Sequence, residues 1–144
     1  MAKQYRLTAP RRFFNRFIGP LIRMGLGGRH TYLLTTRGRK TSTPLTHPVT
    51  LIEDDERFLV APYGVRAWVK NARASGHVEL TRARRTERLR VEELSPRDAA
   101  PILREYRARV KVVAPFLDAT PDSPLEAWAD EAKTHPVFRL LPED

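Results

Sequence analysis

The chain has 144 residues, of which 41% are hydrophobic, enough for one domain with a single core and too few for two large domains. It contains no cysteine, which excludes disulfides, thiolate catalysis and the usual zinc sites. The net charge of +9 is uneven: residues 1–52 hold ten Lys/Arg and no Asp/Glu, whereas residues 114–144 hold seven Asp/Glu and two Lys/Arg. This asymmetry predicts an anionic partner, either nucleic acid, an anionic membrane surface or a polyanionic small molecule.

The N-terminal part predicts a basic amphipathic helix. Residues 11–24 carry apolar side chains at helical spacing with cations mostly between them, and a glycine-rich connection follows up to residue 28. The helix has two alternative roles, capping the core or contacting an anionic membrane surface. No apolar run approaches the roughly 18 residues of a membrane span, and the pattern of a secretory signal is missing, so we expect a cytoplasmic protein, with membrane association as the alternative.

Beyond residue 28, short alternating stretches predict strands that are separated by polar turns. Pro48 confines its strand to a sheet edge or a bulge, because proline donates no backbone hydrogen bond. Gly76 predicts the end of one helix, and Ser95, Pro96 and Asp98 fit the N-cap, first and third positions of another. The residues from Pro115 to Pro124 read as a loop. The predicted strands are 31–36, 44–52, 57–63, 77–83, 87–94 and 136–141, and the predicted helices are 66–76, 95–110 and 124–133.

These elements predict a mainly β fold with flanking helices. About six mostly antiparallel strands without a strand–helix–strand repeat pack most economically as a closed or partly closed β-barrel. We therefore expect residues 1–144 to form one barrel domain.

The sequence contains no motif that supports hydrolytic catalysis or metal binding. The serines lack the glycine context of a nucleophile elbow, and the histidines are far apart without the spacing of metal ligands, so we predict no metal site. A lone histidine in a strand is more often a packing or hydrogen-bonding residue. The histidines are His30, His47, His77 and His135.

The turn between the first two predicted strands is a better candidate. Gly38, Arg39, Lys40, Thr41 and Ser42 combine exposed backbone N–H groups, two cations and two hydroxyls, which are the groups that bind a phosphate. The spacing is not that of a P-loop, so a solvated hairpin tip stays the alternative. Further along, residues 61–64 could form a wall against a flat ring, and residues 68–71 begin a helix whose N-terminal amides could face an anion.

Four segments together carry a family resemblance: YLLTTRGRKTSTPLTHPVTLI, RFLVAPYG, WVKNARASG and HPVFRLLP. They resemble the deazaflavin-dependent nitroreductase family, the branch of the FMN-binding-like, flavin-type split β-barrels that uses the 8-hydroxy-5-deazaflavin coenzyme F-420. The likeness extends over roughly residues 17–142. It implies a split barrel that binds F-420, with FMN as the alternative coenzyme.

The resemblance also implies roles for individual residues. Arg39, Lys40 and Thr41 would contact the phosphate and the oligoglutamate tail of the coenzyme, and Trp68 and Asn71 would hold the following helix against the site. Tyr63 would be a proton donor if its hydroxyl faces the ring. The residues that would line the deazaflavin ring are Val49, Thr50, Ala61, Pro62 and Gly64.

On this basis we expect a reductase that transfers a hydride from reduced deazaflavin to an electron-poor small molecule: an activated alkene, a quinone or a nitro compound. Residues 41–45 add no further cation, which leaves part of the phosphate contact open. The last tyrosine is Tyr106, which leaves nitro reduction open. The alternatives are a non-catalytic deazaflavin, flavin or haem binding module and a nonspecific nucleic-acid binder. We expect no specific nucleic-acid binding, because aromatic residues do not alternate with the cations. A homodimer is left open.

Overall fold

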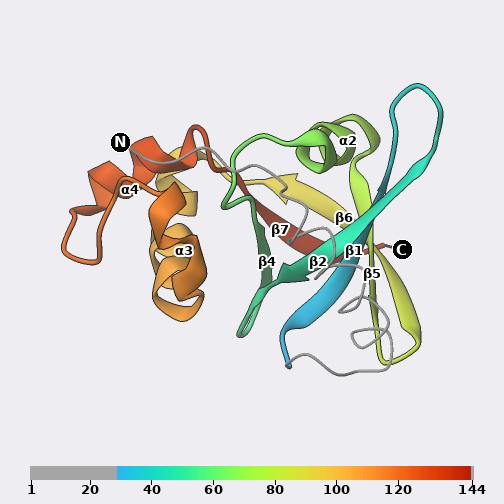
Figure 1. The fold of residues 1–144 in the computed structure, drawn as a ribbon, viewed down its shortest axis with the longest axis horizontal. Helices are drawn as coiled ribbons and strands as arrows, with labels where there is room; N and C mark the ends of the chain where they lie inside the picture. Colours follow the sequence, from blue (N-terminus) through green and yellow to red (C-terminus); the bar gives the residue numbers. More distant parts are fainter. Residues whose placement is uncertain (1–28, 144) are drawn as a thin grey trace.

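The computed structural model describes residues 29–143, so the predicted helix at 11–24 lies outside the described residues. One seven-stranded sheet dominates the fold, and all of its strand pairs are antiparallel (Figure 1). The order across the sheet is β2-β1-β5-β6-β7-β4-β3. The strands are β1 (Thr31–Arg37), β2 (Pro44–Thr50), β3 (Ile52–Glu53), β4 (Arg57–Val60), β5 (His77–Arg82), β6 (Arg85–Glu93) and β7 (Val137–Pro142).

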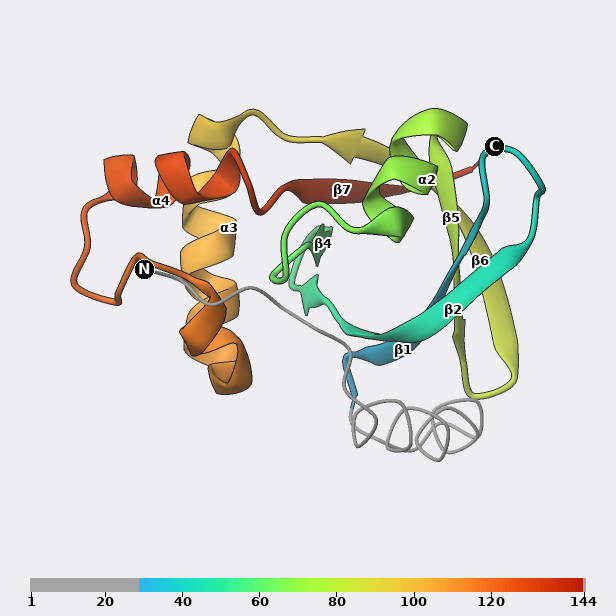
Figure 2. The ribbon, with the colours of Figure 1, turned by 45° about the horizontal axis from the view of Figure 1, so that its top comes forward.

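The sheet curls into a split barrel because β2 and β3, which lie at its two ends, are consecutive in the chain (Figure 2). β2 pairs with β1 and β3 pairs with β4, yet only Leu51 separates β2 from β3. Leu51 is 2% exposed, and its N–H donates to the His30 carbonyl at 2.9 Å. The predicted fold class is thus confirmed, and the single strand expected at 44–52 is divided in two where it passes from one partner to the other.

Within residues 29–143, β2 pairs on one side only, which leaves its other edge free. Pro48 lies in this edge strand, opposite Leu33, as its missing N–H predicts. The barrel is therefore split along β2, between this free edge and the end of β4.

The predicted helix boundaries agree closely with the structure. α2 (Ala67–Ser75) ends at Gly76, whose φ of 81° is left-handed, and α3 (Pro96–Arg109) begins after Ser95, whose Oγ accepts from the Asp98 N–H at 3.2 Å. α4 (Leu125–Ala132) follows a 3₁₀ helix, η1 (Lys111–Phe116), that overlaps the segment predicted as loop. None of the helices in residues 29–143 has both the length and the apolar character needed to cross a membrane.

The turn between β5 and β6 is shorter than predicted. The sequence pattern suggested residues 84–86 as the connection, but β6 already begins at Arg85. Ala83 and Arg84 form the turn, with φ values of 51° and 62°. Two successive left-handed residues match the right-handed twist of the flanking strands, which favours a two-residue connection.

The core has two parts. Inside the barrel, α2 packs Trp68, Val69 and Ala72 against buried side chains such as Leu34 and Phe138. Outside it, α3 and α4 lie beside β4 and β7 and enclose Trp128, which is 0% exposed (Figure 1). Residues of β2 line a common hollow with Trp68 of the first part and Tyr106 of the second.

Candidate functional site

A pocket of about 170 Å³ lies between the free edge of β2, the end of β4, α2 and α3. Its lining is mostly apolar and aromatic, and no Asp, Glu, Lys or Arg of the described residues belongs to it. Such a pocket suits a flat, uncharged ring. The lining residues are Thr31, His47, Pro48, Val49, Thr50, Val60, Pro62, Tyr63, Trp68, Tyr106, Val110 and Val112.

The structure brings five of the sequence-predicted residues into this lining, but it leaves out Ala61 and Gly64, which were expected to line the ring. Ala61 is 1% exposed, packs in the barrel core and donates its N–H to the Pro136 carbonyl at 2.9 Å. Gly64 has a φ of 89° and donates to the Ala61 carbonyl at 3.2 Å, so it forms the turn after β4. These two residues shape the backbone, and a β-carbon at position 64 would be strained. The five lining residues are Val49, Thr50, Pro62, Tyr63 and Trp68.

The hairpin tip between β1 and β2 is a closed turn. The Gly38 N–H donates to the Thr43 carbonyl at 2.9 Å, and the Ser42 N–H donates to the Gly38 carbonyl at 3.0 Å. The hydroxyls of Thr41 and Thr43 lie 2.8 Å apart. Thr41 is thus already engaged within the turn, whereas Lys40 is exposed and has no hydrogen bond or ion pair with the part of the chain described.

Arg39 connects this tip to α2. Its guanidinium donates to Asn71 Oδ1 at 3.1 Å, and Asn71 Nδ2 donates to Thr36 Oγ1 at 3.2 Å. Asn71 and Thr36 are only 5% and 3% exposed. The Asn71 amide is neutral, so this hydrogen bond leaves the positive charge of Arg39 uncompensated. A guanidinium carries five N–H donors, so most of them stay available to bind an anion.

Through α2, the hairpin tip and the pocket belong to one face of the molecule. Asn71, which holds Arg39, lies one helical turn after Trp68, which lines the pocket. Three residues of helix rise by about 4.5 Å. The pocket without charged groups and the cationic tip therefore stand side by side along α2.

His47 is a pocket residue that no sequence motif identified. Burial lowers its pKa from 6.5 to about 4, so its imidazole is neutral at physiological pH. Its ring lies 6.1 Å from that of Trp68, between centroids. The strand pattern contains this histidine, but nothing local indicates that its neighbours form a pocket.

Tyr106 is the second residue that the sequence did not assign to a site. It is 5% exposed, and burial, followed by the neighbouring Tyr63, raises its pKa well above the usual value. Its hydroxyl therefore stays protonated. Tyr63 packs edge-on against Phe116 with ring centroids 5.0 Å apart. Nothing in the sequence around Tyr106 indicates that this helix position lies beside Tyr63.

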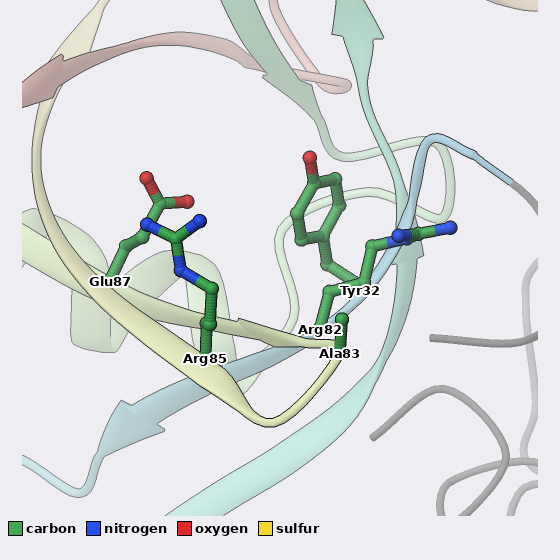
Figure 3. A pocket seen from close by; sticks show the side chains of 5 residues that line it. All are labelled: Tyr32, Arg82, Ala83, Arg85 and Glu87. Carbon is green, nitrogen blue, oxygen red and sulfur yellow. The ribbon is translucent and has the colours of Figure 1, made fainter. Parts of the chain in front are cut away.

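A second hollow, of about 200 Å³, lies beside the β5–β6 turn and contains none of the predicted site residues (Figure 3). Tyr32, Arg85 and Glu87 line it together with Arg82 and Ala83. Its polar groups are largely engaged with protein: the Tyr32 hydroxyl donates to Glu53 at 2.9 Å, and Glu87 pairs with Arg57 at 3.1 Å. The chemistry therefore favours the smaller pocket beside β2.

Comparisons with known proteins indicate the family of the chain and support its fold. A family model described as F-420H(2)-dependent quinone reductase matches residues 9–118. Among solved structures, the haem storage protein HutZ from Vibrio cholerae is 13% identical with a TM-score of 0.56, over 81% of this chain and 83% of that one. A protein of unknown function from Agrobacterium tumefaciens is 18% identical with a TM-score of 0.58, over 100% of this chain and 59% of that one. A structure titled F-420 reductase is 16% identical with a TM-score of 0.50, over 87% and 92%. No curated protein matches, and at these identities the structural likenesses show the fold alone.

Proposed function

Because the chain belongs to the F-420H(2)-dependent quinone reductase family, we propose that it transfers a hydride from reduced F-420 to an electron-poor small molecule. The family makes the protein a deazaflavin-dependent reductase. The proposed substrates are quinones, activated alkenes and nitro compounds. One observation carries the proposal: a charge-free pocket and a cationic hairpin tip adjoin each other through the Arg39–Asn71 contact.

The size of the pocket supports the binding of a ring rather than of the entire coenzyme. Pockets that enclose a whole drug-sized ligand measure about 300–1,000 Å³, whereas this one measures about 170 Å³. The flat ring would lie between Val49 and Thr50 on one side and Pro62 on the other, with Trp68 at the end toward α2. The residues present thus fit the ring of F-420.

The hairpin tip supports the binding of the anionic remainder of the coenzyme. Arg39 is held in place by Asn71, so little side-chain entropy is lost when it meets a phosphate or a carboxylate. Lys40 would act as a point charge beside it. Asn71 would contribute by holding Arg39 rather than by contacting the coenzyme.

The reduced coenzyme supplies the hydride when bound, so the chain has to provide position, water exclusion and a proton. Tyr63 is the proposed proton donor, because its hydroxyl belongs to a pocket residue on the turn after β4. Tyr106 supports it with a second hydroxyl that burial keeps protonated. Val60, which is 2% exposed, and Val110 form the apolar part of the lining that would exclude water.

Fluorescence titration with F-420 tests the binding proposal. We expect micromolar or tighter binding of oxidised F-420, and binding of FMN at least tenfold weaker, a difference of about 1.4 kcal/mol. Arg39→Ala should weaken F-420 binding by about 1.5–3 kcal/mol, the range of a charge-assisted hydrogen bond, and Lys40→Ala by less. The matched control is Arg85→Ala, which removes a cation beside the other hollow. Equal or tighter FMN binding would refute the coenzyme assignment.

The length of the coenzyme tail identifies the group that Arg39 and Lys40 bind. If the pair contacts the glutamate tail, the losses should shrink with a coenzyme that lacks it, whereas unchanged losses would indicate the phosphate. If neither substitution changes affinity by more than a few tenths of a kcal/mol, the tip is only a solvated turn.

Steady-state reduction of menadione, an activated enone and a nitroarene tests the substrate class. Tyr63→Phe should lower kcat by about 100-fold, within the usual contribution of a general acid, while F-420 binding stays unchanged. Tyr106→Phe is the matched comparison, since it removes the neighbouring hydroxyl. An unchanged kcat in Tyr63→Phe would remove this residue from the mechanism.

A further inference from the structure

His47 occupies a position on the inner face of the barrel where an apolar side chain would be expected. Its partner in the strand register is Leu34, which is 0% exposed, and directly opposite residues project to the same face of a sheet. The ring of Trp68, from α2, lies 6.1 Å from the imidazole between centroids. The side chain is half-buried and lines the pocket, so its ring nitrogens can be reached by a group bound there.

Residues 29–143 contain no hydrogen-bond partner for either nitrogen of the His47 ring. The ring is also part of the pocket lining. The other titratable groups that face the same pocket are Tyr63, from the turn after β4, and Tyr106, from α3. No carboxylate or cation among the described lining residues competes for the imidazole. The neutral ring therefore offers one N–H donor and one acceptor to whatever the pocket binds.

We propose that His47 donates a hydrogen bond from its imidazole to a carbonyl oxygen of the flat ring bound in this pocket. The identity of that ring rests on the proposed function, and both the coenzyme and a quinone substrate carry ring carbonyl groups. A donor fixed in apolar surroundings discriminates strongly, because a ring without a carbonyl would leave it unpaired. His47 is thus a specificity residue of the pocket, distinct from the cationic hairpin tip.

The test compares His47→Phe with His47→Gln. Phenylalanine keeps the aromatic contact with Trp68 and removes the donor, whereas glutamine keeps a donor. Thermal midpoints first establish that both variants are folded. Binding of oxidised F-420 is then measured by fluorescence without substrate, and the KM for menadione is measured at saturating reduced F-420.

If the carbonyl belongs to the coenzyme, His47→Phe should weaken F-420 binding about tenfold, the effect of one hydrogen bond, and His47→Gln should restore most of it. If it belongs to the substrate, F-420 binding stays unchanged while the KM for menadione rises about tenfold in His47→Phe and recovers in His47→Gln. Either result supports the donor role.

The inference is overturned if neither quantity changes, or if both variants lose binding equally, because the ring would then only fill space. If the wild-type protein binds F-420 but the two variants do not differ from each other, the role of His47 is refuted and the proposed function stands. Wild-type protein that binds neither F-420 nor FMN refutes both.

Discussion

The half-buried imidazole of His47 should make the stability of the ligand-free protein depend on pH. Its pKa is about 4 in the folded protein, against an ordinary value of 6.5. Between these two values the unfolded chain binds a proton that the folded chain does not. Stability is therefore complete above about pH 6.5 and is lost as the pH falls toward 4. His47→Phe removes the group and should remove this loss.

The size of the effect follows from the two pKa values. One pH unit corresponds to about 1.36 kcal/mol, so the difference between 6.5 and about 4 amounts to about 3 kcal/mol when the pH has fallen below both values. Between pH 7 and pH 5 the linkage relation gives about 2 kcal/mol. For a chain of this length that corresponds to a change in Tm of about 4–8 °C.

The measurement is thermal or urea unfolding of wild-type protein and His47→Phe at pH 7, 6 and 5 without coenzyme. Other groups titrate in both proteins, so only the difference between the two curves reports on His47. This difference should grow by about 2 kcal/mol in favour of the variant from pH 7 to pH 5. His77→Gln is the control, because its ring nitrogen contacts Arg88 at the surface. Parallel pH profiles for wild type and His47→Phe would refute the reasoning.

Three further substitutions test the frame around the site by urea unfolding. Glu131→Ala should lower the free energy of unfolding by about 2–5 kcal/mol. The reason is that Glu131 Oε1 accepts hydrogen bonds from the Asp118 and Ala119 N–H groups at 2.6 and 2.7 Å, and the substitution removes both bonds. An unchanged unfolding midpoint would contradict this. Gly76→Ala should lower the free energy of unfolding by about 1 kcal/mol, because its φ of 81° is unfavourable for alanine. Nothing lies within 4 Å of an added β-carbon, so no steric clash contributes. A stabilised variant would argue against the left-handed cap. Asn71→Ala should cost about 1–3 kcal/mol and also weaken F-420 binding, measured by fluorescence; normal affinity would show that Arg39 needs no support.

Local signals in the sequence were enough to predict most of the secondary structure. The Ser95 cap and the left-handed Gly76 act within a few residues of their own backbone, so the sequence shows them directly. Pro48 predicted an edge strand because a missing donor has the same consequence in any sheet. The motif around Gly38 and the segment from Ala61 to Gly64 likewise predicted which parts of the chain lie at the candidate site.

The composition of the pocket depended on contacts that only the tertiary structure creates. His47 and Tyr106 both line it, although they are far apart in the chain, and Asn71 reaches Thr36 across 35 residues. Ala61 and Gly64, adjacent in sequence to the pocket residues Pro62 and Tyr63, do not line the pocket, and Ala61 packs in the barrel core. Whether an inward-facing side chain meets the core or a pocket is decided by the elements packed opposite it. Here that outcome depends on β2 leaving one edge free beside the end of β4, because its chain turns at Leu51 to close the barrel.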